Sequence, residues 1–379
     1  MTHITKSTRK PTIYIEATAL TRQKKTGVDF YAQGLLQSLV DQMPGYDFVC
    51  FHFADTNAPL SVKGKNVREQ VITSMSARLY RLLMLLRIAP SIERLLGLGK
   101  MDTVIFPNFF VAPVRTKSAS VYPIIYDTAY LDTPEYVAPR NRANLRTLVP
   151  RGIKRSSRVL TISDATAERL HHWYGLAKDR ALVLYPAAPD PVRADTKLAL
   201  PKKYLLYVST LEPRKNVANI IQAYNSLPTA LRDTYALVLA GGKGWMDDEI
   251  QEQLDVSDPK QVMSLGYVTD AQKWALYGGA TAFVYPALFE GFGMPILEAQ
   301  RAGVPVITCR NSSLPEAAGD AALYVGQDAN SIAKGMHKIL TDSKLRKQLA
   351  ESGKKHAQKF TWQNSAKKLA QVIRAQEAS

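Results

Sequence analysis

Cysteine is scarce in this sequence, and several common catalytic motifs are missing from it. The 379 residues include two cysteines, Cys50 and Cys309, far apart along the chain. They cannot build a disulfide framework or a cysteine-based zinc site, and they favour a reducing, cytoplasmic setting. No GxxxxGK[ST], HExxH or GxSxG motif occurs, and no GxGxxG follows the first predicted strand. AGGKGW at 240–245 is too short and irregular for that motif, so a nicotinamide dehydrogenase is disfavoured.

Long apolar runs are also absent. The longest, Leu82 to Leu86, ends at Arg87, far short of the roughly 20 residues of a membrane-spanning helix. The first residues, MTHITKSTRKPT, are polar and basic, so we expect no secretory signal. Hydrophobic residues make up 46% of the chain and charged residues 22%, which is typical of a globular protein rather than a disordered one.

Positive charge exceeds negative charge by 16, and the excess is uneven. Residues 1–190 contain 26 basic and 15 acidic side chains, whereas residues 191–379 contain 23 and 18. The run from Arg140 to Arg158 has seven basic residues and no acidic one. Such patches suit nucleic acid, anionic lipid or phosphorylated substrates, and the alternative is a set of solvated helix faces. Nucleic acid is disfavoured because no RNA-recognition signature with interleaved aromatics accompanies the charge.

Short apolar runs alternate with segments of helical pattern, which predicts parallel sheets covered by helices. The rhythm restarts near residue 203, after a proline-rich stretch at 184–203 that is typical of a linker. We therefore predict two doubly wound α/β domains, 1–190 and 200–361, with a ligand cleft between them. Strands are expected at 12–17, 48–53, 103–107, 122–127, 158–163, 203–209, 235–241, 262–266, 282–286 and 304–309.

The segment STLEPRKN, Ser209 to Asn216, directly follows a predicted strand. Pro213 stops the strand, and Arg214 and Lys215 would stand at the start of a helix. Two cations beside free helical N–H groups can clamp a diphosphate. The alternative is that Glu212 and Arg214 are ordinary surface charges at a turn.

The segment FEGFGMPILEAQRAGVPVI, from Phe289 to Ile307, also follows a strand. Glu290 comes first, and the GFG loop after it lets backbone N–H groups approach a ligand closely. Pro295 suits the first position of a helix that would place Glu298 in its first turn and end at Gly303. The two carboxylates can address different parts of one ligand; alternatively, both merely complement the helix dipole.

Together these segments resemble the family 4 retaining glycosyltransferases of the GT-B fold, over nearly the whole chain. The E-x7-E element from Glu290 to Glu298 is the most specific match. The other matching motifs are TGVDFYAQGLLQSL, YDTAYLDTPEYVAP, LTISDATAERL, VLYPAAPD and FTWQNSAKKLAQVI. The resemblance implies an acceptor-binding first domain, a donor-binding second domain, and a helix at about 362–379 that packs back on the first.

The resemblance also implies a role for each matching residue. Glu290 would contact hydroxyls of the donor sugar, and Glu298 would hold the ribose. Arg214 and Lys215 would bind the diphosphate and stabilise it as it leaves. The remaining donor-side positions are Gly27, Ser209, Thr210, Gly291, Phe292, Gly293 and Met294.

The sequence departs from the family pattern in two places. Ser209 and Thr210 stand where many members have an arginine, so Arg214 would carry that charge. Tyr126 replaces the histidine before Asp127, and tyrosine is a poor base because its ordinary pKa is about 10. Asp127, counted with the catalytic residues, either contacts the acceptor or is a buried structural carboxylate. Asn108, Tyr126 and Asp127 make up the expected acceptor side.

The resemblance implies transfer of a sugar with retention of the configuration at its anomeric carbon. The reaction would need no cofactor and no metal, and the leaving phosphate would take the proton of the acceptor hydroxyl. GDP-mannose is the favoured donor, and rhamnose or N-acetylhexosamine donors stay open. The acceptor would be a lipid-linked or polysaccharide intermediate of a cell-surface glycan such as O-antigen. Two alternatives are an epimerase or phosphorylase of the same fold, and a non-enzymatic protein that binds RNA or membrane.

Residues 75–100 are basic and amphipathic. Leucines at 79, 82, 83 and 86 fall near one helical face, and Arg78, Arg81, Arg87 and Arg94 supply cations. Such a helix can lie in an anionic membrane interface, which would place the protein at the inner face of the plasma membrane. The alternative is a helix that packs on the sheet of the first domain.

Overall fold

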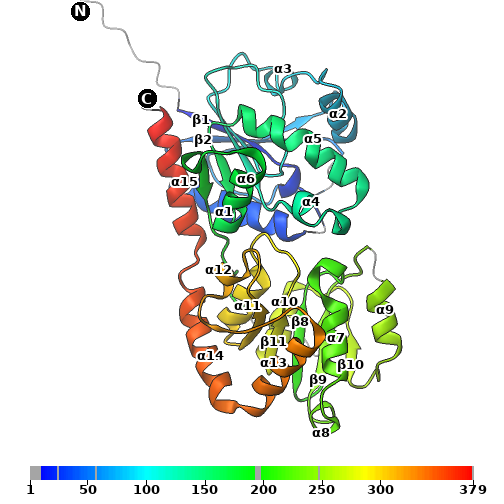
Figure 1. The fold of residues 1–379 in the computed structure, drawn as a ribbon. Helices are drawn as coiled ribbons and strands as arrows, with labels where there is room; N and C mark the ends of the chain where they lie inside the picture. The colour runs from blue at the N-terminus through cyan, green and yellow to red at the C-terminus, as the bar shows by residue number, and fades with distance from the viewer. Residues whose placement is uncertain (1–9, 24, 56–57, 193–197, 246–247, 378–379) are drawn as a thin grey trace, which may run out of the picture. The chain divides into compact units, whose positions relative to one another are not determined.

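The chain divides into two compact units, described here by a computed structural model (Figure 1). The described residues are 10–23, 25–55, 58–192, 198–245 and 248–377. The first unit comprises Met1–Pro186 and Trp362–Ser379, and the second comprises Ala187–Thr361. Most of the polar N-terminal segment that argued against a secretory signal lies outside the described residues.

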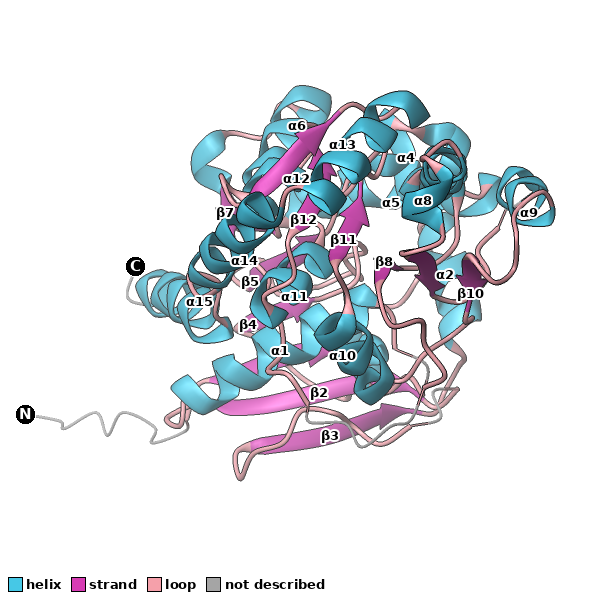
Figure 2. Cartoon of the chain, turned by 90° about the horizontal axis from the view of Figure 1, so that it is seen from below, coloured by secondary structure: helices cyan, strands magenta, loops and turns pink. Residues whose placement is uncertain are grey.

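The first unit contains a parallel sheet with the strand order β3-β2-β1-β4-β5-β6-β7. The chain moves outward from β1 in one direction and then returns to place β4 on its other side, so the order reverses between β1 and β4. Figure 2 shows β2 and β3 side by side at one edge. The strands are β1 Thr12–Glu16, β2 Asp47–Phe53, β3 Val67–Ile72, β4 Thr103–Phe106, β5 Ser120–Ile125, β6 Val159–Thr161 and β7 Ala181–Val183.

The helices of the first unit include one from the C-terminus of the chain, which packs on α1. Gly34 allows this contact, because a Cβ there would lie 2.3 Å from the indole of Trp362. The helices are α1 Gly27–Gln42, α2 Ala77–Leu85, α3 Ile92–Leu95, α4 Ala129–Asp132, α5 Pro139–Arg155, α6 Asp164–Tyr174 and α15 Trp362–Glu377. Short 3-10 helices span η1 Thr18–Leu20, η2 Pro134–Tyr136 and η3 Lys178–Arg180.

The second unit repeats this topology in a parallel sheet with the order β10-β9-β8-β11-β12-β13. Its order reverses between β8 and β11. The strands are β8 Tyr204–Val208, β9 Ala236–Ala240, β10 Val262–Ser264, β11 Ala282–Tyr285, β12 Val306–Cys309 and β13 Ala322–Val325. The helices are η4 Pro213–Lys215, α7 Val217–Asn225, α8 Thr229–Arg232, α9 Asp248–Asp255, α10 Asp270–Gly279, α11 Met294–Ala302, α12 Leu314–Ala318, α13 Ala329–Thr341 and α14 Ser343–Ala357.

Two doubly wound parallel sheets confirm the predicted fold class. All ten expected strands are present, because strands buried on both faces appear in a sequence as short apolar runs. The sequence analysis missed β3, β7 and β13, which are all edge strands. The prediction of one helix across 75–100 was wrong. Helix α2 ends at Leu85, and Arg87, with a φ of 63°, turns the chain away from the helix axis. A second helix, α3, begins only after Pro90.

Candidate functional site

The predicted diphosphate clamp and the first glutamate of the E-x7-E element lie at the switch point of the second sheet. Strands β8 and β11 pair directly, and each ends in one of these segments. Ligands of open α/β sheets bind where the strand order reverses, outside the carboxyl ends of the strands. Arg214 and Lys215 do not begin a long helix as expected. They lie in η4, and Asn216, with a φ of 65°, separates them from α7.

Four charged side chains form one cluster at this point. Lys215 Nζ donates to Glu290 Oε1, and Arg214 Nη1 lies 3.8 Å from Glu290 Oε2. Arg214 Nη2 also donates to Glu212 Oε1 at 2.9 Å. The structure therefore brings together three of the predicted catalytic residues, and it adds Glu212, which the sequence analysis considered only as a surface charge.

Glu290 stays ionised in this cluster although its side chain is only 11% exposed. Burial alone would raise its pKa, but the charges of Lys215 and Arg214 and hydrogen bonds from Lys215 and Tyr285 hold the pKa below the ordinary value. An ionised carboxylate can accept hydrogen bonds from sugar hydroxyls. The neighbouring cations can pair with phosphate oxygens, since charge-assisted hydrogen bonds are the strong ones.

A pair of serines after β12 fixes the backbone on both sides of Glu290. The Glu290 N–H donates to Ser312 Oγ at 3.1 Å, and Ser313 Oγ donates to the Glu290 carbonyl at 2.9 Å. Ser312 has a φ of 43°, a strained backbone conformation for a residue other than glycine. The sequence analysis missed these residues, and its only signal was two adjacent serines after a predicted strand.

The glycine-rich loop after β9 supports the loop that follows β8. Gly241 has a φ of 155°, and a Cβ there would lie 1.8 Å from the carbonyl oxygen of Ser209. A Cβ on Gly244 would lie 2.5 Å from the carbonyl oxygen of Leu211. The AGGKGW segment is thus glycine-rich because it packs against the backbone that precedes Arg214.

Glu298 lies in a different setting from the one expected. It is the fifth residue of α11, beyond the first turn, because the helix begins at Met294. Its oxygens accept from Lys273 Nζ at 2.7 Å and from the Tyr277 hydroxyl at 3.1 Å. Burial lowers the pKa of Lys273, but Glu298 and Asp270 together outweigh burial and raise the pKa above its ordinary value. The helix ends at Gly303 as predicted.

A row of aromatic rings connects the surroundings of the two glutamates. The Tyr277 and Phe283 rings lie 5.5 Å apart, as do the Phe283 and Tyr285 rings. Tyr277 donates to Glu298 and Tyr285 donates to Glu290. Both carboxylates are therefore held by one buried aromatic core. Tyr277 could not be assigned from sequence, because it lies 21 residues before Glu298, on another helix. Tyr285 lies only five residues before Glu290, at the end of β11, and the sequence analysis did not consider it.

The remaining donor-side positions are loop or helix-end residues of the second unit, apart from Gly27. Ser209 and Thr210 follow β8, and the Ser209 N–H donates to the Ala240 carbonyl at 3.0 Å. Phe292 is buried and packs edge-on against Phe360. Gly293 caps α11 with a φ of 100°. The structure therefore places the stretch Gly291, Phe292, Gly293 and Met294 where α11 begins.

The predicted acceptor-side residues lie at the carboxyl edge of the first sheet. The Tyr126 hydroxyl donates to the Pro107 carbonyl at 2.8 Å, next to Asn108. Burial raises the pKa of Tyr126 well above its ordinary value, so this hydroxyl cannot serve as a base near neutral pH. Asp127 Oδ1 accepts from the Ala129 N–H at 3.0 Å. Gly27 is the first residue of α1, and a Cβ there would contact nothing within 4 Å.

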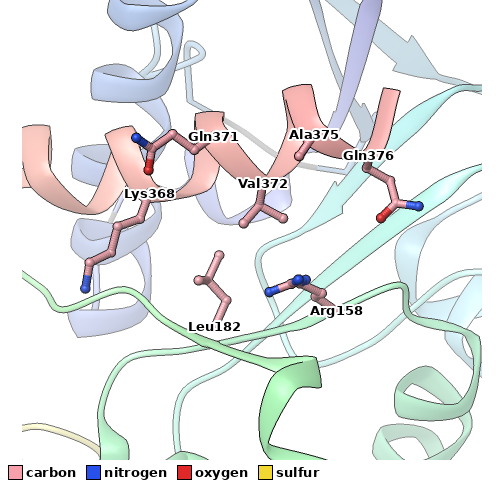
Figure 3. A pocket seen from close by; sticks show the side chains of 7 residues that line it. All are labelled: Arg158, Leu182, Lys368, Gln371, Val372, Ala375 and Gln376. Atoms are coloured by element: carbon pink, nitrogen blue, oxygen red, sulfur yellow. The ribbon is translucent and has the colours of Figure 1, made fainter. Parts of the chain in front are cut away.

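A hollow of about 330 Å³ lies beside α15 in the first unit and contains none of the predicted site residues. Figure 3 shows Val372 and Gln376 of α15 pointing towards Leu182 and Arg158. Its lining holds no carboxylate, which distinguishes it from the cluster around Glu290. Across the described ranges, no group of three or more His, Cys, Asp or Glu side chains is arranged to hold a metal ion.

Helix α2 both packs on the sheet and exposes apolar side chains. Tyr80 is buried, whereas Leu79 and Leu82 are 47% and 52% exposed, and Leu86 and Ile88, just after the helix, are 59% and 65% exposed. One face of α2 therefore belongs to the core, as the packing alternative predicted, and the other carries leucines at the surface; contact with a membrane stays a prediction. In the part of the chain that the structure covers, we find no helix with the length and apolar character required to cross a membrane.

Two doubly wound sheets, with a charged cluster at the switch point of the second, are typical of the GT-B type of glycosyltransferase. Residues 190–356 match the family described as Glycosyl transferases group 1. The chain is 32% identical over 272 residues to O-antigen chain mannosyltransferase B of Escherichia coli, covering 68% of this chain and 70% of that protein. The chain therefore belongs to the glycosyl transferases group 1 family.

Another relative agrees with this family assignment, and a solved structure shares the fold. The serotype-specific mannosyltransferase WbdA of Escherichia coli is 30% identical over 230 residues, which are 56% of this chain but only 28% of that longer protein. The fold matches sucrose-phosphate synthase (tll1590) from Thermosynechococcus elongatus with a TM-score of 0.71 at 18% identity, over 98% of this chain and 100% of that one.

Proposed function

We propose that this protein is a retaining mannosyltransferase that uses GDP-mannose and extends an O-antigen type of polysaccharide. The observation that carries the proposal is the cluster of Arg214, Lys215 and Glu290 at the switch point of the second sheet. Two mannosyltransferases among the relatives of the chain favour mannose as the transferred sugar.

In this proposal the cluster stabilises the leaving diphosphate. The bond between the anomeric carbon and the phosphate oxygen breaks, and negative charge develops on that oxygen. Arg214 and Lys215 lie where they can neutralise this charge, so the step needs no metal ion. The acceptor oxygen bonds to the anomeric carbon from the same face, and its proton passes to the leaving phosphate. Retention follows because attack and departure share one face.

Glu290 then orients the sugar, and Glu298 holds the ribose. Glu290 is the counter-ion of Lys215, so donor binding would divide the contacts of this lysine between carboxylate and phosphate. Glu298 keeps acceptor capacity because each carboxylate oxygen has two lone pairs and accepts one bond from Lys273 or Tyr277.

The acceptor in this proposal is a lipid-linked or polysaccharide intermediate, met at the inner face of the plasma membrane. The exposed leucines of α2 and its neighbouring arginines favour contact with an anionic membrane surface. The uneven positive charge, which is concentrated in residues 1–190, favours the same partner.

A thermal-shift screen with GDP-mannose, UDP-glucose, UDP-N-acetylglucosamine and dTDP-rhamnose tests the donor. A ligand that binds only the native state raises the melting temperature by mass action, and GDP-mannose is expected to give the largest rise. A larger rise in melting temperature with another nucleotide sugar would identify that sugar as the donor in place of GDP-mannose. No rise with any of the four would contradict the proposed function.

Product analysis tests the chemistry. Transfer should give an α-linked mannoside, visible by NMR of the anomeric proton, in the presence of a chelator. A β-linked product would exclude retention, and activity lost with the chelator and restored by a divalent ion would exclude the metal-independent step. Epimerised nucleotide sugar formed without an acceptor would instead favour an epimerase of the same fold.

A further inference from the structure

The hollow beside α15 has the size and the lining of a binding site that the proposed reaction does not use. Its volume of about 330 Å³ falls within the usual range of ligand pockets. The lining comes from one side of α15, from Leu182 in β7 and from Arg158 directly before β6 (Figure 3). Of its seven residues, two are cations, two are amides and three are apolar. No acidic residue is among them, so the lining carries a net positive charge.

The register of the first sheet shows which other side chains face the same way. Leu160 pairs with Ile124 of β5 and with Leu182 of β7, so these three side chains point to one face of the sheet. Tyr122 lies two residues before Ile124 and therefore points to that face as well. Arg158 lies two residues before Leu160 and lines the hollow together with Leu182. Tyr122 and Arg158 are thus neighbours on the face of the sheet that borders the hollow.

Arg158 is a half-buried cation without a partner in the part of the chain that the structure describes. Its guanidinium forms no hydrogen bond and no ion pair there. A guanidinium carries five N–H donors, and leaving buried donors without acceptors is costly. The neighbouring Arg180 shows the usual alternative, because it donates to the carbonyls of Ile153 and Ser156 at 3.0 and 2.6 Å. The donors of Arg158 instead face a hollow where an anion would satisfy them.

Tyr122 adds an unpartnered hydroxyl next to this guanidinium. The residue is fully buried, and across the described ranges its hydroxyl has no hydrogen-bond partner. Burial raises the pKa of Tyr122, and Arg158 is close enough to be one of the groups that oppose this shift. The acidic residue of α15, Glu377, accepts from the Tyr46 hydroxyl at 2.6 Å and is not part of the lining. An anion drawn in by Arg158 would bring acceptor oxygens to the same face as the Tyr122 hydroxyl.

The apolar part of the lining suits a carbon body attached to the anion. An aliphatic surface lies beside Arg158 and is formed by Leu182, Val372 and Ala375 (Figure 3). Lys368 adds a second positive charge further along α15, which attracts anions to this side of the helix. A small inorganic ion would leave the aliphatic surface uncovered, and a neutral apolar molecule would leave Arg158 unpaired. A ligand that combines an anionic group with an apolar body satisfies both parts.

We propose that this hollow binds a phosphate ester, with the phosphate paired to Arg158 and the carbon body on the aliphatic surface. Phosphate fits because the guanidinium fork pairs with it through two parallel hydrogen bonds, and its further oxygens can accept from the amide of Gln376. Soluble phosphate esters and phospholipid head groups present this same chemistry. The site shares no residue with the cluster around Glu290 and does not depend on the proposed function.

Isothermal titration calorimetry on the full chain tests the site with hexyl phosphate, which combines the phosphate with a short apolar body. Hexyl phosphate is expected to bind the wild type, and hexanol and inorganic phosphate, which each lack one part, should bind more weakly. Arg158→Gln keeps a polar side chain but removes the charge, and it should raise the Kd for hexyl phosphate about tenfold. The control Arg155→Gln, an exposed arginine outside the lining, should leave the Kd unchanged.

Three results would overturn the assignment: no binding of hexyl phosphate, the same Kd in the wild type and Arg158→Gln, or equally tight binding of hexanol. If Arg158→Gln does not fold, Lys368→Gln takes its place, with the exposed Lys367→Gln as its control. Glycerol 3-phosphate and vesicles that contain phosphatidic acid then separate the two sources of phosphate. Binding of the soluble ester that requires Arg158 supports a metabolite, and binding of the vesicles that requires Arg158 supports a lipid head group. Binding of both that is unchanged in Arg158→Gln would count against the site.

Discussion

Replacement of Lys215 by methionine tests the charged cluster most directly. The Lys215 side chain is 8% exposed and that of Glu290 is 11% exposed, so the substitution leaves a buried carboxylate without its nearest cation. Breaking a buried pair from one side costs about 3–5 kcal/mol. We take the lower end, about 3 kcal/mol, because Arg214 remains 3.8 Å from Glu290. For a unit of this size, that corresponds to a fall in Tm of about 6–12 °C.

The pH dependence separates loss of charge pairing from loss of packing. A carboxylate whose pKa is lower in the folded state than in the unfolded state adds stability above its unfolded pKa, and this stability is lost as the pH falls through the folded pKa. Glu290 is such a group in the wild type. Without Lys215, burial should raise the pKa of Glu290. As the pH falls, protonation of Glu290 then removes the uncompensated buried charge, and the variant loses less stability relative to the wild type. The difference in Tm between the wild type and Lys215→Met should therefore become smaller from about pH 7 to about pH 4.5.

Differential scanning fluorimetry across this pH range measures the gap. Lys215→Met combined with Glu290→Gln should recover part of the lost stability, because no uncompensated charge remains. Arg68→Met, in the exposed pair with Asp47, is the matched control and should change stability by no more than about 1 kcal/mol. A difference in Tm that is the same at every pH would refute the electrostatic reasoning.

The kcat/KM of Lys215→Met should fall by about 10²–10³ at pH 7, as expected when charge stabilisation of the transition state is lost.

Three further predictions follow from the supporting structure. Ser313→Ala should lower kcat/KM for the donor about tenfold with a loss of about 1 kcal/mol in stability, and unchanged kinetics would show that this hydroxyl is not needed to position the site. Gly241→Ala should destabilise the chain by more than about 1 kcal/mol in urea unfolding, whereas Gly242→Ala, where a Cβ meets nothing within 4 Å, should not; equal effects would disprove the steric argument. Leu82→Asp with Leu86→Asp should abolish co-sedimentation with phosphatidylglycerol vesicles, and undiminished binding would remove α2 from the membrane contact.

The central strands could be predicted because burial on both faces leaves a continuous apolar signature. Strand β8, for example, has five buried residues in succession. Strand β3 carries Arg68, Glu69 and Gln70 in its middle, since an edge strand faces solvent and has no reason to be apolar. Polar edge strands such as β3 therefore leave no apolar run to recognise, although the edge strand β10 was predicted from its run at 262–266.

The charged residues of the site could be predicted because each follows a strand directly in sequence. Arg214 follows β8 and Glu290 follows β11, and doubly wound topology brings those two strand ends together. Their partners could not be predicted in the same way. Ser313 reaches the backbone of Glu290 from the loop after β12, and Lys273 reaches Glu298 from α10. These contacts depend on how neighbouring loops and helices are packed, for which the local sequence pattern carries no signal.

The contrast between the two switch points supports a division of labour between the units. Each sheet places a carboxylate where its order reverses: Glu290 in the second unit and Glu16 in the first. Glu290 has two cations beside it, so that site can hold a sugar next to an anionic phosphate. Glu16 forms no ion pair among the described residues, and its Oε1 accepts from Thr18. In the proposed function, the second unit neutralises the leaving group and the first unit recognises the acceptor.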